Sequence, residues 1–131
     1  GLSLTQFKSS CQQDQAAKGA LQFRCIVSNV GHRAGDEVIQ VYHSLGSDIR
    51  ETLPHPAPIK ALVDFARLSL PMGNLDETHF AFPSQSMLFA VVNENGDRVA
   101  YSGTHRLIFS NGVDFYQEFQ FDFRGDDAKV E

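Results

Sequence analysis

Histidines, acidic residues and cysteines are the side chains of this sequence that could carry chemistry. There are five histidines, sixteen acidic residues and two cysteines, and the histidines are His32, His43, His55, His79 and His105. None belongs to a His-Glu-x-x-His motif, and none has a cysteine pair or another histidine at the short spacing of a zinc site. We therefore expect no metal ion and no cofactor. The sixteen acids could include the acid and nucleophile of a glycosidase, which must stand at a set separation.

The remaining motifs of catalysis are missing from the sequence. We find no Ser-His-Asp arrangement, no reactive-cysteine motif and no glycine-rich phosphate loop. Cys11 and Cys25 could form a disulfide in an oxidising compartment or remain free thiols elsewhere. If residues 12–19 join two strands as a simple hairpin, Cys11 lies opposite a position near Ala20, several residues from Cys25. The pattern therefore favours free thiols, with the disulfide as the alternative.

Composition limits the partners of the chain. Its 131 residues fit one domain, and the net charge of −5 disfavours nucleic acid and anionic membranes, which both require clustered Lys and Arg. The longest apolar run, Met87 to Val92, is far shorter than the roughly 20 residues of a membrane helix. The chain begins at Gly1 and shows no signal peptide, so we expect a processed product or a piece of a longer protein.

Two neighbouring apolar runs form the centre of the predicted structure. Residues 21–27 alternate between apolar and polar side chains, which is typical of a half-buried strand, and the run Val38 to Tyr42 is almost wholly apolar, which is typical of a central strand. Between them, Asn29, Gly31 and Gly35 are expected to supply the positive φ angles of a chain reversal.

The rest of the chain continues the strand pattern. Strands are predicted over residues 1–7, 78–82, 88–92, 98–101, 105–109 and 113–123, and residues 12–20 are predicted to be a loop. The Asn95-Gly96 pair predicts a hairpin, and helical spacing is limited to a turn near Ala61 to Ala66. We predict an all-β, immunoglobulin-like sandwich of two antiparallel sheets, with about seven to eight strands, over residues 1–123. A polar tail, 124–131, follows.

The segment 27–42 resembles a known signature. It is similar to that of the fibronectin type III-like domain at the C-terminus of glycoside hydrolase family 3 enzymes, the β-glucosidases and β-xylosidases. The matching residues are Val27, Asn29, Gly31, Gly35, Glu37, Val38, Gln40 and Tyr42. Residues 58–70, with Lys60 and Phe65, resemble a second segment of that family, although Asp64 stands where glycine is usual. Residues 1–7 resemble the segment by which the family's polypeptide enters this domain.

The resemblance implies a role without catalysis. In that family the nucleophilic Asp and the acid Glu belong to other domains, and a barrel alone takes about 250 residues, which this chain cannot contain. We therefore expect a secreted, non-catalytic accessory domain that packs on the catalytic domains, stabilises them and shapes the rim of their substrate pocket. The family's loop corresponding to residues 43–58 leans towards those domains, so His43, Arg50, Glu51 and His55 are candidate contacts. The alternative for this loop is a plain surface excursion.

Two other functions have weaker support in the sequence. A carbohydrate-binding platform needs exposed aromatic rings, but the chain has no Trp and three Tyr, of which Tyr42 is expected in the core. A stand-alone extracellular adhesion module is the alternative to the accessory domain. Its only motif is Arg124-Gly125-Asp126, a tripeptide that occurs often by chance.

Overall fold

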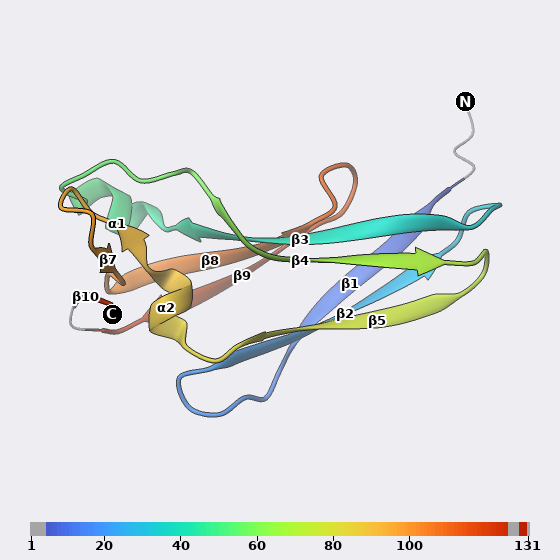
Figure 1. Ribbon diagram of the computed structural model, residues 1–131, viewed down its shortest axis with the longest axis horizontal. Helices are drawn as coiled ribbons and strands as arrows, with labels where there is room; N and C mark the ends of the chain where they lie inside the picture. Colours follow the sequence, from blue (N-terminus) through green and yellow to red (C-terminus); the bar gives the residue numbers. More distant parts are fainter. Residues whose placement is uncertain (1–4, 126–128, 131) are drawn as a thin grey trace.

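The computed structural model describes residues 5–125 and 129–130, and it consists mainly of two antiparallel sheets packed face to face (Figure 1). The first sheet contains, in spatial order, β1 (Phe7–Asp14), β2 (Leu21–Asn29) and β5 (Leu75–Phe82). The second contains, in spatial order, β4 (Ala61–Leu70), β3 (Gly35–Leu45), β8 (Gly103–Ser110) and β9 (Tyr116–Phe123). These strands confirm the predicted all-β sandwich.

Shorter elements gather at one end of the sandwich (Figure 1). They are α1 (Ser47–Thr52), α2 (Gln85–Phe89), β6 (Val91–Val92), β7 (Arg98–Val99) and β10 (Lys129–Val130). The three strands form a small sheet in the order β10-β7-β6, so the hairpin around Asn95-Gly96 is confirmed in a shorter form. The helical turn near Ala61 to Ala66 is wrong, because that segment pairs with β3 as part of β4. Neither helix is long enough to cross a membrane, and the described residues contain no other.

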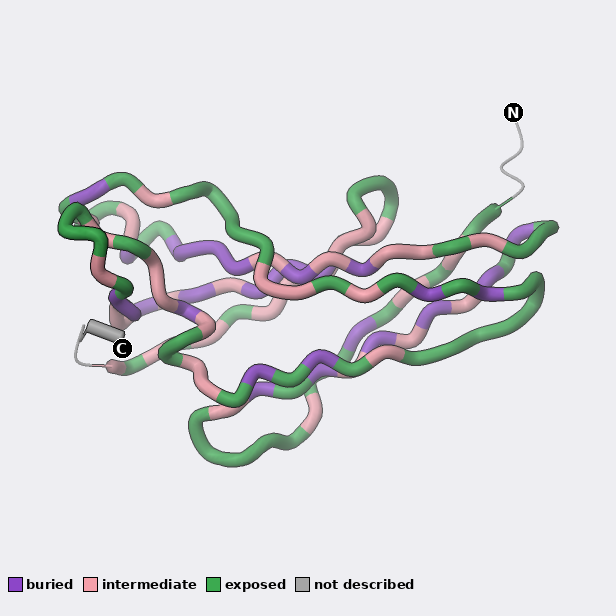
Figure 2. Tube along the Cα trace, viewed as in Figure 1, coloured by how far each residue is buried: buried purple, intermediate pink, exposed green. Residues whose placement is uncertain are grey.

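The alternation of the strands explains the core. Phe23, Cys25 and Val27 on β2 are fully buried and belong to one core cluster with Ile39 and Val41 of β3. Figure 2 shows buried positions alternating with less buried ones along the strands. The inner face of β9 is aromatic, as predicted, and its Phe119 and Phe121 rings contact Phe23. Burying each such side chain contributes about 1.5–3 kcal/mol, which makes these alternating positions the main source of stability.

The corner between β2 and β3 differs from the prediction. The two strands lie in different sheets, so the chain crosses from one sheet to the other here. Gly31 and Gly35 are not among the positive-φ glycines of the described residues. The corner is held by the buried Asn29 side chain, which donates to the carbonyls of Arg33 and Leu70 and accepts from the Gly31 N–H, each at 3.0 Å. Gly35 serves close packing instead, because a Cβ there would lie 2.9 Å from Thr5 Cγ2.

Near both ends of the chain, the observed strand boundaries differ from the predicted ones. Residues 1–4 of the predicted first strand lie outside the described residues, and β1 starts at Phe7. The predicted loop at 12–20 is too long, because β1 continues to Asp14 and β2 begins at Leu21. At the other end β9 stops at Phe123, and in the tail Gly125 bonds to the Ser102 hydroxyl. Asp126 of the Arg-Gly-Asp tripeptide lies outside the described residues.

Candidate functional site

The four predicted contact residues lie where β3 leads into α1 and the following loop. His43 is only 4% exposed, and its Nε2 lies 2.9 Å from His105 Nδ1. His105 Nε2 lies 2.7 Å from the Tyr101 carbonyl oxygen, which can only accept, so His105 donates there and uses its Nδ1 to accept from His43. The His105 ring is therefore neutral in this arrangement. His43 thus faces the interior of the sandwich.

Phe89 of α2 completes this buried cluster. Its ring is stacked on His105 at 4.5 Å between centroids and lies 5.4 Å from His43. Burial lowers the pKa of His43 to about 3, and the nearby His105 and Arg50 add to this effect. Burial also lowers the pKa of His105. Since the described residues contain no group of three metal-ligating side chains, the pair is best explained as a neutral packing unit joined by a hydrogen bond.

Arg50 and His55 hold the loop that follows α1. The Arg50 guanidinium donates to the carbonyls of Pro58 and Ile59, at 2.7 and 2.9 Å, and to that of Leu45. The His55 ring is almost buried and lies 2.8 Å from the Tyr101 hydroxyl. Glu51, in contrast, is exposed on α1. Three of the four predicted residues thus make contacts inside this chain, and their contact with another domain stays a prediction.

The signature residues divide into two groups. Asn29, Gly31 and Gly35 form the corner described above, and the Glu37 carboxylate accepts from the Asn111 side chain at 3.0 Å. Gln40 and Tyr42 alternate with the buried Ile39 and Val41, and therefore point outward from the four-stranded sheet.

Lys60 and Phe65 extend this outer face. Phe65 lies opposite Gln40 in the register of β3 and β4, and it is 60% exposed. The Lys60 ammonium lies 4.3 Å from the centroid of the Tyr42 ring. The expectation that Tyr42 is in the core is wrong, because its position in the pleat places it on the outer face, where it is half-buried.

A groove of about 550 Å³ opens beside the His43 cluster. One wall is the start of β4, and the other is formed by the end of β5, α2 and β6. Its apolar lining includes Leu45, Leu62, Phe82, Met87, Leu88 and Val92. Arg98 and His43 are its only titratable residues among those described, and the Arg98 guanidinium donates to the Met87 carbonyl at 2.9 Å. The groove is thus apolar, with one cation at its border.

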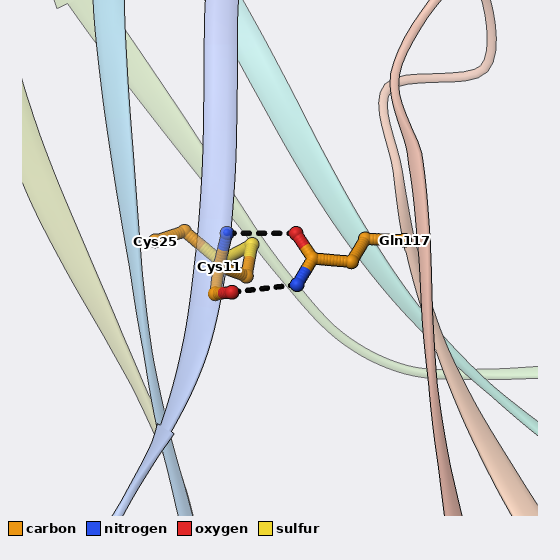
Figure 3. The surroundings of a disulfide bond; sticks show 3 residues. All are labelled: Cys11, Cys25 and Gln117. Carbon is orange, nitrogen blue, oxygen red and sulfur yellow. Dashed lines mark hydrogen bonds between the residues drawn. A yellow bond between two sulfur atoms is a disulfide. The ribbon is translucent and has the colours of Figure 1, made fainter.

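A disulfide lies on the opposite side of the sandwich (Figure 3). Cys11 of β1 is directly opposite Cys25 of β2 in the register, and their sulfur atoms are bonded. The preference for free thiols was therefore wrong, because β1 extends three residues beyond Cys11 before the turn begins. Next to the bond, the Gln117 side chain of β9 accepts from the Cys11 N–H at 2.9 Å and donates to the Cys11 carbonyl at 2.6 Å.

Several of these residues escaped the sequence-based interpretation. Nothing in the neighbouring sequence marks Gln117 or Arg98, because each contacts a segment that only the fold brings next to it. Phe89 belonged to a segment that we predicted to be a strand, and it lies instead in the five-residue helix α2.

Comparison with known proteins supports the fold. No family model matches the sequence, and no curated protein matches it significantly. Among solved structures, a GH3 β-glucosidase from Bifidobacterium adolescentis matches 96% of this chain with a TM-score of 0.76 and 19% identity. A β-glucosidase from Listeria innocua matches 93% with a TM-score of 0.73 and 24% identity. One from Erythrobacter marinus matches 93% with a TM-score of 0.69 and 26% identity.

The matched region is a small part of each neighbour. This chain covers 18% of the Bifidobacterium protein and 16% of each of the other two. The likeness confirms the resemblance to family 3 β-glucosidases that the segment 27–42 indicated. In its fold, the chain corresponds to one segment, 16–18% of the length, of these β-glucosidases.

Proposed function

We propose that this chain is a non-catalytic accessory domain of a family 3 glycoside hydrolase of the β-glucosidase or β-xylosidase type. The observation that carries the proposal is the match of nearly the whole chain to a small segment of several β-glucosidases. The signature residues support it independently, because they were found without reference to the fold. In this role the domain stabilises the catalytic domains and contributes to the rim of their substrate pocket.

The chemistry of the groove supports a non-catalytic role. Glycoside hydrolysis in most families requires two carboxyl groups that flank the scissile bond, about 5–9.5 Å apart. The largely apolar groove described above has no Asp or Glu in its lining. We therefore assign hydrolysis to the rest of the parent enzyme and not to this domain.

The loop after α1 is the part that we assign to the pocket rim. Arg50 donates to two carbonyls of this loop, those of Pro58 and Ile59, and to that of Leu45 at the end of β3, which limits the freedom of the loop without burying it. A rigid, exposed loop loses little conformational entropy when it meets another surface. Glu51, which is exposed on α1, is the side chain of this region that is available for a polar contact.

We also propose that the parent enzyme is secreted. The Cys11–Cys25 bond supports this location, because disulfides persist in oxidising compartments and are rare in the reducing cytosol. Export can be tested by measuring β-glycosidase activity and this domain, with an antibody, in culture medium and in cell lysate. Recovery of both only from the lysate would contradict the proposal.

A graft tests the accessory role directly. The matching segment of the Listeria innocua β-glucosidase is replaced by this chain, and the controls carry either a deletion or an unrelated β-sandwich of similar length. We expect the graft to hydrolyse aryl β-glucosides and to unfold at a higher temperature than both controls. A graft no more stable or active than the unrelated sandwich would overturn the accessory role.

The isolated chain provides the second test. It should give no turnover of aryl β-glucosides or aryl β-xylosides at any concentration. Saturable turnover that persists through repurification would contradict the non-catalytic assignment, whatever the graft does.

A further inference from the structure

Exposed apolar side chains line the groove. Ten large hydrophobic residues of the described chain are exposed, and three of them belong to the groove lining. These three are Leu62 of β4, Met87 of α2 and Val92 of β6. Apolar surface gathered in this way marks an interaction site more often than a solvated surface, whereas single exposed residues elsewhere need no explanation.

Both walls of the groove include the last strand of a sheet. β4 ends the four-stranded sheet and β6 ends the small sheet, and no described strand pairs with the outer edge of either. The groove lies beside Ala61, Leu62 and Val63 at the start of β4. At the next residue, the Asp64 carboxylate accepts the Phe65 N–H at 2.8 Å. Edge strands next to an apolar groove suit an extended peptide, which can pair through its main chain while its side chains enter the groove.

The charges around the groove limit which peptide could bind there. His43 is neutral at pH 7 because burial lowers its pKa, so covering the groove isolates no charge there. The Arg98 side chain is exposed, and among the described residues its guanidinium makes one hydrogen bond, to the Met87 carbonyl. A cation covered without a counterion is costly. The occupant therefore needs an apolar stretch and an acidic side chain near Arg98.

We infer that this groove binds an extended apolar segment, with an acidic side chain facing Arg98, from the catalytic part of the parent hydrolase. The inference rests on the proposed function. This chain covers at most 18% of the neighbouring β-glucosidases, so more than four fifths of such an enzyme remains to supply the segment. The volume of about 550 Å³ accommodates several side chains of such a segment.

Charge substitutions in the graft described above test this inference. Leu62→Glu and Met87→Glu each place a carboxylate on a groove side chain that is about half exposed, and Val113→Glu does the same at a residue that is 90% exposed on the β8–β9 loop. In the isolated chain all three should leave the melting temperature within 2 °C of the parent, because the positions are exposed. In the graft we expect Leu62→Glu and Met87→Glu to abolish the rise in melting temperature over the deletion control. Val113→Glu should retain it.

Arg98 and hydrogen exchange give two further readouts. Arg98→Glu should weaken the graft and Arg98→Lys should largely restore it, since Lys preserves the charge opposite the acidic partner. Backbone amides at 61–63 and 91–92 should exchange at least tenfold more slowly in the graft than in the isolated chain. Equal effects of Leu62→Glu and Val113→Glu, or unchanged exchange, would overturn the inference while the accessory role stands.

Other occupants are separate outcomes of the same experiments. A concentration-dependent dimer of the isolated chain that Leu62→Glu dissolves would assign the groove to a second copy and overturn the inference. If the unsubstituted graft is no better than the deletion control, the proposed function fails and the inference fails with it. That result differs clearly from a stable graft that is insensitive to the groove substitutions.

Discussion

The two open sides of the sandwich, where the edges of its sheets approach each other, are built in opposite ways. On one side β1 and β9 are bridged by the Gln117 side chain, and the Cys11–Cys25 disulfide lies beside this bridge. On the other side, β4 and β5 are joined by a turn, but towards the helical end the side opens into an apolar groove. The first side is closed by contacts within the chain. The second leaves apolar surface exposed along the groove, which is the surface that we propose to be covered by a segment of the parent hydrolase.

The largest effect is expected from the core beneath the open side. Phe89→Ala should lower the free energy of unfolding by about 3–5 kcal/mol, because it removes a fully buried ring that contacts His43, His105, Phe121 and Phe123. Denaturant unfolding measures this change. Met87→Ala on the same helix is the matched control and should change stability by less than about 0.5 kcal/mol.

The contrast between the two sides of the sandwich is stronger if Phe89→Ala perturbs only the side with the groove. The side-chain amide signals of Gln117 should then keep their chemical shifts. A loss of less than about 1 kcal/mol would show that α2 does not depend on this ring, contrary to its burial.

Removing the disulfide tests the closed side. Cys11→Ala with Cys25→Ala should destabilise the chain by about 3 kcal/mol, the value expected for opening a loop of roughly 15 residues in the unfolded chain. Unfolding of the parent protein in the presence of a reductant should give a similar loss. Equal stability of the double variant and the oxidised parent would show that the bridge contributes nothing to the closed side.

Gln117 tests the other component of that side. Gln117→Glu replaces the donor to the Cys11 carbonyl by a second acceptor, and we expect a loss of about 1–3 kcal/mol. Gln13→Glu introduces the same change at an exposed position on β1 and should have little effect. If both variants unfold at the same denaturant concentration, the bridge is not a stabilising contact.

The last effect, given per pH unit, concerns pH and the buried histidine pair. The His43 pKa of about 3 lies below the ordinary value near 6.5, so between these values the unfolded chain carries a proton that the folded chain lacks. Stability should therefore be complete above pH 6.5 and fall as the pH decreases, by at most about 1.4 kcal/mol per pH unit from this group. The lowered pKa of Asp48 acts in the same direction.

His43→Gln isolates this contribution. A glutamine amide can still donate to His105 but does not titrate, so the slope of stability against pH between 6 and 4 should decrease by roughly one proton. Urea unfolding at a series of pH values measures the slope. An unchanged slope would show that His43 is protonated in the folded chain over this range, contrary to the lowering of its pKa by burial.

Local pattern predicted the strands well and the contacts between them poorly. Alternation placed Phe23 and Val27 in the core because strand side chains point to opposite faces in turn. The disulfide depended on where β1 ends, and a turn shifted by a few residues changes the partner of Cys11. The two helices, of six and five residues, are too short to show helical periodicity.

The candidate site was predictable only in part. The signature placed Asn29 at a corner, but it did not reveal that the side chain bonds to Leu70, which lies 41 residues away. His43 was chosen because it lies at the start of a long loop, yet its partner His105 follows it by 62 residues. Arg98 and Met87 meet only because β7 packs beside α2. Such contacts arise from tertiary packing and leave no trace in a sequence window.

The Gln117 bridge has a consequence for behaviour at high concentration. The middle of β1 would otherwise present a free N–H and C=O to any neighbouring molecule, and unpaired strand edges act as templates for intermolecular sheet growth. One amide side chain thus occupies the N–H and C=O of Cys11 in the middle of this edge, and it does so with the same donor and acceptor pair that an incoming strand would offer.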